Sequence, residues 1–397
     1  FFESNRDFYN YEIGTNGLLF SPQGGLRINA PDLTKILQLF YLKGIDEEEK
    51  IISADLIIEM LKNQWTYNGK NGDNYDGLFY SWGLGVHRVN ANSNYQNDQI
   101  FDDSNVYVLR RPPFGKKLES AHNMQREFKI ITELSKNNLK VPKPVLLCVD
   151  KQISEDDFYI MEYIEGETIA DNLIAEKYSD IEKQKITESF ISALAELHSF
   201  NVLNSELSDL GKHENYVSRQ LNRWNKQFDA QKVRDISDLD VATELLFENI
   251  PTQQKVSIVH GDYRLDNVRI SNNSVAAVVD WELCTLGDPL ADLGTVIASW
   301  SSKDEIDTPF IYSPSLSEGF PSRQEILNLY EERSILNLDE IEFYIRLSFW
   351  KHAMIMEGVY VRYSLGYYGN VDKKDVDAFG QSTLSFAKKA SNKNLLK

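Results

Sequence analysis

Three oxygen-bearing side chains follow one another at short intervals in the second half of the chain. Asp262 and Asn267 lie in the segment VHGDYRLDN, which continues an apolar run, and Asp280 ends a second apolar run in VAAVVDWE. Phosphoryl transfer needs a carboxylate that receives the proton of the attacking hydroxyl, and oxygen ligands that hold Mg²⁺ against the phosphates. The order and spacing predict Asp262 as the catalytic base and Asn267 and Asp280 as magnesium ligands. The alternative is that all three are turn or loop residues.

Two charged residues nearer the N-terminus are predicted to face apolar neighbours. In the strand-like segment NVYVLR, alternation places Arg110 on the same face as Val106 and Val108. In the helix expected at 120–134, Glu127 falls on the apolar stripe. A carboxylate that faces a core requires a partner, and Arg110 is the candidate. Such a pair positions ATP phosphates in kinases, although two solvated charges at the edges of their elements would show the same pattern.

A buried strand at 158–163 (FYIMEY) runs into the turn-rich Glu165-Gly166-Glu167 and separates a region of strands from a region of helices. This is the pattern of a hinge between two lobes, at which the backbone of Met161 to Tyr163 would hydrogen-bond the edge of adenine. Apolar periodicity after the hinge predicts five long helices, at about 182–199, 214–230, 239–248, 323–335 and 340–363. We therefore expect an α+β fold, with a small mixed-sheet lobe joined to a larger helical lobe.

The segments HGDYRLDN, VVDWE and GDPLADLG resemble motifs of the aminoglycoside phosphotransferase and choline kinase superfamily. VLRRPP, YIMEYIEGE and LAELHS are similar to the kinase-like domains that are fused to some acyl-CoA dehydrogenases. The resemblance runs from about residue 104 to the end and implies a protein-kinase-like two-lobe fold. It also implies transfer of the γ-phosphate of ATP, with Mg²⁺, to a hydroxyl of a small molecule, and it points to a hydroxyacyl-CoA. Arg110 stands where the family has Lys or Arg for the phosphates, and Glu127 would orient it.

The first hundred residues differ in texture, with many Gly, Asn and aromatic residues. The turn at Gly24 to Arg27 and the segment SWGLGV resemble the C-terminal part of class C β-lactamase-type serine hydrolases. The Ser-x-x-Lys, Tyr-x-Asn and Lys/His-x-Gly elements of such hydrolases do not occur in their proper context, so we expect an α/β fragment without hydrolase chemistry. This fragment stands where a complete phosphotransferase has two strands joined by a glycine loop. The expected domains are 1–103, 104–166 and 167–397.

Composition narrows the classes of partner. Lys and Arg number 42 against 60 Asp and Glu, a net charge of −18 that repels nucleic acid. Two cysteines are too few for a disulfide framework, and no long apolar run or signal peptide is visible, which favours the cytoplasm over a membrane. The expected partner is a hydroxylated small molecule, and nothing predicts an oligomeric state.

The apparent loss of the glycine loop leaves two main functional classes open. The chain is either an ATP-dependent phosphotransferase or a non-catalytic, kinase-like protein that binds nucleotide. A serine hydrolase fragment is a marginal third alternative.

Overall fold

The computed structural model describes residues 106–112, 123–151, 154, 156–302, 305, 308–365 and 373–396, together with short pieces of the first 101 residues. Contacts between Cα atoms divide the chain into two units, one made of Phe1–Tyr95 with Asp150–Glu155 and one made of Gln96–Val149 with Asp156–Lys397. In the first unit four two-residue strands are described: β1 (Ile45–Asp46), β2 (Glu49–Lys50), β3 (Trp65–Thr66) and β4 (Ser81–Trp82).

Most of the hydrolase-like fragment, including Gly24 to Arg27 and the Gly83-Leu84-Gly85 segment, lies outside the described residues. The domain limits expected at 103–104 and 166–167 stay predictions.

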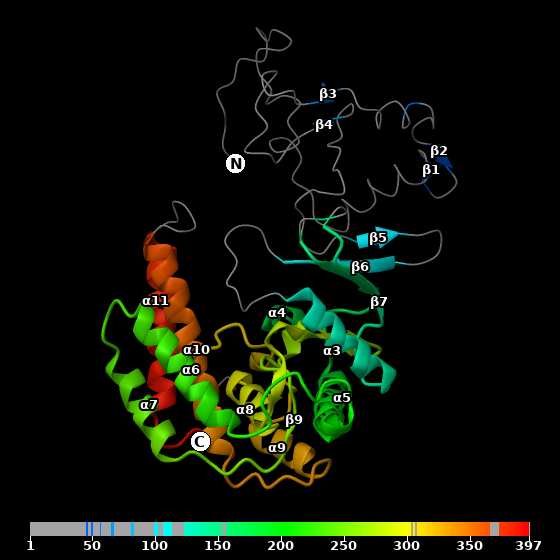
Figure 1. The fold of residues 1–397 in the computed structure, drawn as a ribbon. Coiled ribbons are helices and arrows are strands. Elements are labelled where there is room, and N and C mark those ends of the chain that lie inside the picture. The colour runs from blue at the N-terminus through cyan, green and yellow to red at the C-terminus, as the bar shows by residue number, and fades with distance from the viewer. Residues whose placement is uncertain are drawn as a thin grey trace. The chain divides into compact units, whose positions relative to one another are not determined.

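The second unit begins with a four-stranded antiparallel sheet in the order β5-β6-β8-β7 (Figure 1). The strands are β5 (Gln99–Phe101), β6 (Val106–Arg110), β7 (Pro144–Cys148) and β8 (Phe158–Glu162). Helix α3 (Met124–Lys136) packs on β7 and β8 and buries an apolar stripe that includes Ile130, Ile131 and Leu134. This is the predicted small sheet lobe.

The chain leaves the sheet through Gly166, where the backbone allows only glycine. Its φ is +144°, and a Cβ atom at this position would lie 2.4 Å from the carbonyl oxygen of Ile270. The neighbouring residue Glu167 forms a β-bridge with Ile270, and its N–H donates to that same carbonyl oxygen at 2.8 Å. The turn that ends the sheet lobe is thus fixed to a strand of the helical lobe.

Helices make up most of the remaining chain. They are α4 (Asn172–Ala175), α5 (Asp180–Ser199), α6 (Tyr216–Gln231), α7 (Ser237–Glu248), α8 (Leu290–Ser299), α9 (Arg323–Glu331), α10 (Ile341–Ser364) and α11 (Lys373–Ser391). Helix α10 packs against α8, α11, α7 and α6, and the orange and red helices of Figure 1 show α10 and α11 side by side. Trp350, Tyr344 and Phe349 of α10 are buried, so this helix lies at the centre of the lobe's hydrophobic core.

Two short pairs of antiparallel strands carry the polar loops. Strand β9 (Ser257–Val259) pairs with β12 (Thr285–Gly287), and β10 (Val268–Ser271) pairs with β11 (Ser274–Val278). All three residues of β9 are buried, which anchors the loop that follows it.

The predicted helices of the helical lobe are all present, with ends that differ by a few residues. The helix expected at 120–134 begins at Met124, capped by the Asn123 side chain, which accepts the N–H of Arg126 at 3.0 Å. The helix expected to reach residue 335 ends at Glu331. Helix α11 is not among the five long helices predicted from the apolar periodicity.

Candidate active site

The predicted base lies on a loop whose shape depends on glycine. Asp262 follows β9 after His260 and Gly261, and Gly261 has φ +88°, with the carbonyl oxygen of Leu283 at 2.8 Å from where a Cβ would stand. The next turn, the 3₁₀ helix Leu265–Asn267, returns Asn267 to Asp262. The Asn267 amide donates to the Asp262 carbonyl at 2.9 Å and to its carboxylate at 3.0 Å. The structure therefore brings the two predicted residues together.

A local cation keeps Asp262 ionised. Arg264 Nε lies 3.0 Å from the Asp262 carboxylate, and its terminal nitrogen lies 2.9 Å from Asp266. Burial alone would raise the pKa of Asp262, but the surrounding basic groups, Arg264 foremost, outweigh it and lower the pKa below its usual value. A carboxylate that is ionised at neutral pH is in the form that can accept a proton.

A buried carboxylate that the sequence reasoning missed holds this loop from behind. Asp292 of α8 is fully buried and accepts the backbone N–H groups of His260 at 2.6 Å and Gly261 at 2.8 Å. His198 Nε2 lies 3.4 Å from the same carboxylate. The only signal in the sequence was the position of Asp292 inside an apolar helix, in GDPLADLG. His260 is itself buried and its Nε2 is bonded to the Val279 carbonyl at 2.9 Å, so this ring braces the loop.

The third predicted oxygen ligand is adjacent to the second. Val279 donates its N–H to the Asn267 carbonyl at 3.0 Å, so the backbone places Asp280 beside Asn267. Asp280 adopts the left-handed conformation, with φ 65°, and its side chain is 40 % exposed. Because the Asn267 amide nitrogen points to Asp262, its side-chain oxygen has no partner among the described residues.

An amide oxygen and a carboxylate are donors that Mg²⁺ accepts when phosphates supply further ligands. The described residues contain no group of three or more His, Cys, Asp and Glu side chains that could hold a metal alone. The donor set therefore fits an ion shared with a phosphate ligand.

Arg110 links the sheet lobe to this site. Its Nε lies 3.3 Å from Glu127, and its terminal nitrogen lies 3.3 Å from Asp280 and 3.5 Å from Glu282. The Arg110–Glu127 pair is as predicted, and Glu127 is only 1 % exposed. Burial alone would lower the pKa of Arg110, but the surrounding carboxylates raise it above its usual value, so the guanidinium remains charged.

Glu127 is held by two residues of the sheet. Besides Arg110 on β6, the Tyr159 hydroxyl of β8 donates to its carboxylate at 3.2 Å. Burial raises the pKa of Glu127, and the Arg110 guanidinium offsets only part of that effect. Arg110 is opposite Tyr159 in the β6–β8 register, which is why both side chains reach one carboxylate of α3.

The predicted adenine site has backbone groups that are partly in use. Met161 pairs with Val108 of β6 and with Pro144 of β7, and the Tyr163 N–H donates to the Val106 carbonyl at 3.2 Å. The contact of Met161 and Tyr163 with adenine stays a prediction, and it would have to use groups that the sheet leaves unbonded.

A cavity of about 550 Å³ opens beside Asp262. Its walls are mainly aromatic and aliphatic, with Trp300, Phe310, Tyr312 and Met356 among them. Lys351 and His352 of α10 also line it. The sequence analysis did not place Lys351 or His352 in the site; the signal that marks them is a Lys-His pair within the apolar stretch of α10.

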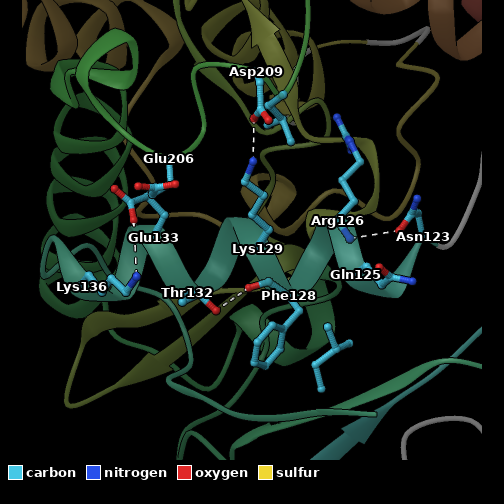
Figure 2. Close-up of a pocket in the computed structure, with 12 residues that line it drawn as sticks. Asn123, Gln125, Arg126, Phe128, Lys129, Thr132, Glu133, Lys136, Glu206 and Asp209 are labelled. Atoms are coloured by element: carbon cyan, nitrogen blue, oxygen red, sulfur yellow. Dashed lines mark hydrogen bonds and ion pairs between the residues drawn. The ribbon is translucent and has the colours of Figure 1, made fainter. Parts of the chain in front are cut away.

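A larger cavity lies along helix α3, away from Asp262. A cavity of about 710 Å³ runs along α3, lined by residues such as Phe128, Lys129 and Lys136 (Figure 2). Lys129 pairs with Asp209 at 2.6 Å, and Lys136 lies 3.9 Å from Glu133. None of its lining residues is among the seven predicted site residues. Its two lysines, Lys129 and Lys136, are both paired with carboxylates. Among the seven predicted site residues, Asp262 lines the cavity of about 550 Å³.

His352 should make stability depend on acidity. Burial lowers the pKa of His352 to about 4 from 6.5. Below pH 6.5 the unfolded chain binds a proton that the folded chain does not, so stability falls as pH drops from about 6.5 to about 4, by up to roughly 3 kcal/mol. His352→Phe, which suits the neighbouring rings of Phe310 and Phe386, should remove this part of the acid sensitivity.

Denaturant unfolding at several pH values measures the effect. The matched control is His213→Gln, which changes a histidine outside the cavity. An unchanged slope of stability against pH in His352→Phe would contradict the assignment.

The two lobes, the Arg110–Glu127 pair and the Asp262–Asn267–Asp280 group define a kinase-like fold of the aminoglycoside phosphotransferase type. The family model described as "Phosphotransferase enzyme family" matches residues 89–313, more than half of the chain. The chain belongs to this phosphotransferase family.

Individual proteins that are similar to this chain support the same assignment to the phosphotransferase family. Human acyl-CoA dehydrogenase family member 11 is 36 % identical over 270 residues, which cover 66 % of this chain and 34 % of the relative. Mouse acyl-CoA dehydrogenase family member 10 is 34 % identical over 260 residues, covering 64 % of this chain and 24 % of the relative. A Ralstonia eutropha structure classed with the aminoglycoside phosphotransferases has a TM-score of 0.62 at 28 % identity, covering 75 % of this chain and 91 % of that one.

The chain spans about a third of the length of the first of these relatives. The predicted superfamily and two-lobe fold are confirmed, whereas the β-lactamase resemblance of residues 1–103 is not confirmed. Among the described residues no helix is both long and apolar enough to cross a bilayer.

Proposed function

We propose that this chain is an ATP- and Mg²⁺-dependent phosphotransferase that acts on a hydroxyl of a small molecule. The observation that carries the proposal is the position of Asp262, an ionised carboxylate that lines a cavity of about 550 Å³ and is bonded to Asn267. Such a carboxylate can receive the proton of an alcohol bound in the cavity.

The other roles follow from the contacts around Asp262. Asn267 and Asp280 would hold Mg²⁺, which neutralises charge on the phosphates when it is bound. Arg110 would bind phosphate oxygens while Glu127 fixes its guanidinium, and the backbone near Met161 and Tyr163 would bind adenine. Asp292 takes no part in proton transfer, and it holds the loop that carries the base.

The cavity supports an acceptor with an apolar body. Its aromatic and aliphatic walls offer little to a polycationic aminoglycoside, which requires carboxylates. A hydroxyacyl-CoA fits this chemistry, and Arg219, Arg223 and Lys226 on α6 are basic residues that could meet its phosphates. The two cysteines, Cys148 and Cys284, are free and buried, which supports a reducing compartment such as the cytoplasm.

ATP turnover against a panel of hydroxylated metabolites, with and without Mg²⁺, tests the proposal. The panel should include hydroxyacyl-CoA thioesters, amino alcohols and aminoglycosides. Turnover that requires both Mg²⁺ and one class of acceptor supports it. Tight Mg²⁺-dependent nucleotide binding without turnover of any acceptor would instead support the non-catalytic, nucleotide-binding alternative.

Asp280→Asn should separate metal binding from proton transfer. Asparagine tolerates the left-handed backbone of this position but lacks the negative charge. The affinity for ADP in the presence of Mg²⁺ should fall at least about tenfold, because a charged ligand is lost, whereas the affinity without Mg²⁺ should change little. Calorimetry with and without EDTA measures both values. An equal loss under the two conditions would remove Asp280 from the metal site.

A further inference from the structure

A basic side chain of α10 reaches the catalytic loop from the acceptor cavity. Lys351 stands next to His352 within an apolar stretch of α10, between the buried residues Trp350 and Ala353. Its ammonium donates to the Gly261 carbonyl at 2.6 Å, one residue before the base. Lys351 lines the cavity of about 550 Å³ that also contains Asp262. The ammonium is therefore close to the position of the reacting hydroxyl.

Lys351 has hydrogen-bonding capacity that the described residues do not use. An ammonium has three N–H donors, and the bond to Gly261 is the one that Lys351 makes within the described part of the chain. A small cavity of about 30 Å³, which Lys351 also lines, has room for about one water molecule. At least one donor therefore remains for the larger cavity. Burial lowers the pKa of Lys351, while Asp262 and Asp292 oppose that effect.

The other two basic side chains of the cavity, Arg264 and His352, do not offer an unpaired positive charge. Arg264 is paired with both Asp262 and Asp266, so its charge is compensated. His352 donates through Nδ1 to the Ser348 carbonyl at 2.8 Å, since that oxygen can only accept, and its low pKa keeps the ring neutral. Lys351 is thus the cation of this cavity that no described carboxylate pairs with.

We propose that Lys351 is a specificity-determining residue, whose ammonium donates a hydrogen bond to a carbonyl or carboxylate oxygen that the acceptor alcohol carries near its reacting hydroxyl. The inference rests on the proposed function, because it names the acceptor of the same site. A buried donor left without a partner costs more than one that is used, so alcohols lacking this oxygen should be rejected. Amino alcohols should be rejected more strongly, since their charge has the same sign as that of Lys351.

The test compares the binding of three alcohols with one carbon skeleton: a medium-chain hydroxy acid, its methyl ester and the corresponding diol. Calorimetry is performed on the full chain with ADP and Mg²⁺, for the wild type, Lys351→Met, Lys351→Gln and Lys351→Arg. The wild type should bind the acid or the ester at least about tenfold more tightly than the diol. Lys351→Met, which has no donor, should lose this ratio, whereas Lys351→Gln and Lys351→Arg, which keep N–H donors, should retain part of it.

The ratio distinguishes specificity from structural support. If Lys351 only braced the Gly261 carbonyl, its variants would weaken the binding of all three alcohols equally and leave the ratio unchanged, which would overturn the proposal. Equal binding of the three by the wild type, or binding of none, would also overturn it. The relative affinities of acid and ester show whether a carboxylate or a carbonyl is recognised. Lys185→Met, at an exposed position of α5, is the matched control and should keep the ratio.

Turnover is measured separately from binding. Alcohols that bind with the expected ratio but receive no phosphate from ATP would contradict the proposed phosphotransfer and leave the role of Lys351 supported. Phosphate transfer to the diol as fast as to the ester, at equal saturation of the site, would contradict the role of Lys351 alone.

Discussion

Asp262→Asn is expected to lower kcat for phosphotransfer by about 10²- to 10⁴-fold, because the variant has no carboxylate to receive the proton of the acceptor hydroxyl. The affinity for ADP with Mg²⁺ should stay within a few-fold of the wild type, since Asn267 and Asp280 remain. The side chain of asparagine can still accept the 3.0 Å hydrogen bond from Asn267, so the loop should keep its shape. Steady-state kinetics and calorimetry measure the two quantities.

The control for this variant is Asp209→Asn, which changes a surface carboxylate that is 74 % exposed and paired only with Lys129. It should leave kcat unchanged. If Asp262→Asn instead lost nucleotide affinity to the same extent as Asp280→Asn, the division of the three residues into one base and two metal ligands would be wrong.

The parts of the site that could be predicted are those that local geometry determines. Asp262, Asn267 and Asp280 lie within one segment of two short strands, so their order and spacing already place them at neighbouring strand ends. The Arg110–Glu127 pair was predictable because strand alternation fixes one face and helical periodicity fixes the other. The outcome required only that α3 pack on the sheet, which its apolar stripe demands.

The parts that could not be predicted depend on packing between distant segments. A hairpin separates Asp292 from Asp262 along the chain, and several helices separate Lys351 from it. The two residues reach the loop of Asp262 only because α8 and α10 pack together. A polar residue in an apolar helix signals that some partner exists, but periodicity does not identify the partner. The same reason kept His352 out of the predicted site. The segment in which a glycine loop would stand lies outside the described residues.

Asp292→Ala is expected to lower the free energy of unfolding by about 3 to 5 kcal/mol, since it leaves buried N–H groups without an acceptor. The wild-type carboxylate accepts from His260 at 2.6 Å and from Gly261 at 2.8 Å, and it is fully buried. Asp292→Asn keeps one oxygen acceptor and should lose less stability. Asp209→Ala, at the exposed carboxylate, should change stability by less than about 0.5 kcal/mol.

Catalysis by Asp292→Asn separates its role from that of the base. At a temperature where the variant is folded, kcat should fall because the Gly261 backbone no longer holds Asp262 at a fixed position, while the pH dependence of the remaining rate should be that of the wild type. Chemical denaturation and a pH profile measure these quantities. A stability loss below about 1 kcal/mol in Asp292→Ala would mean that the loop is held by other contacts, of which the Lys351 bond to Gly261 is the strongest candidate. The double variant of Asp292 and Lys351 would then show whether the two contacts share that role, because contacts that support the same loop give non-additive losses.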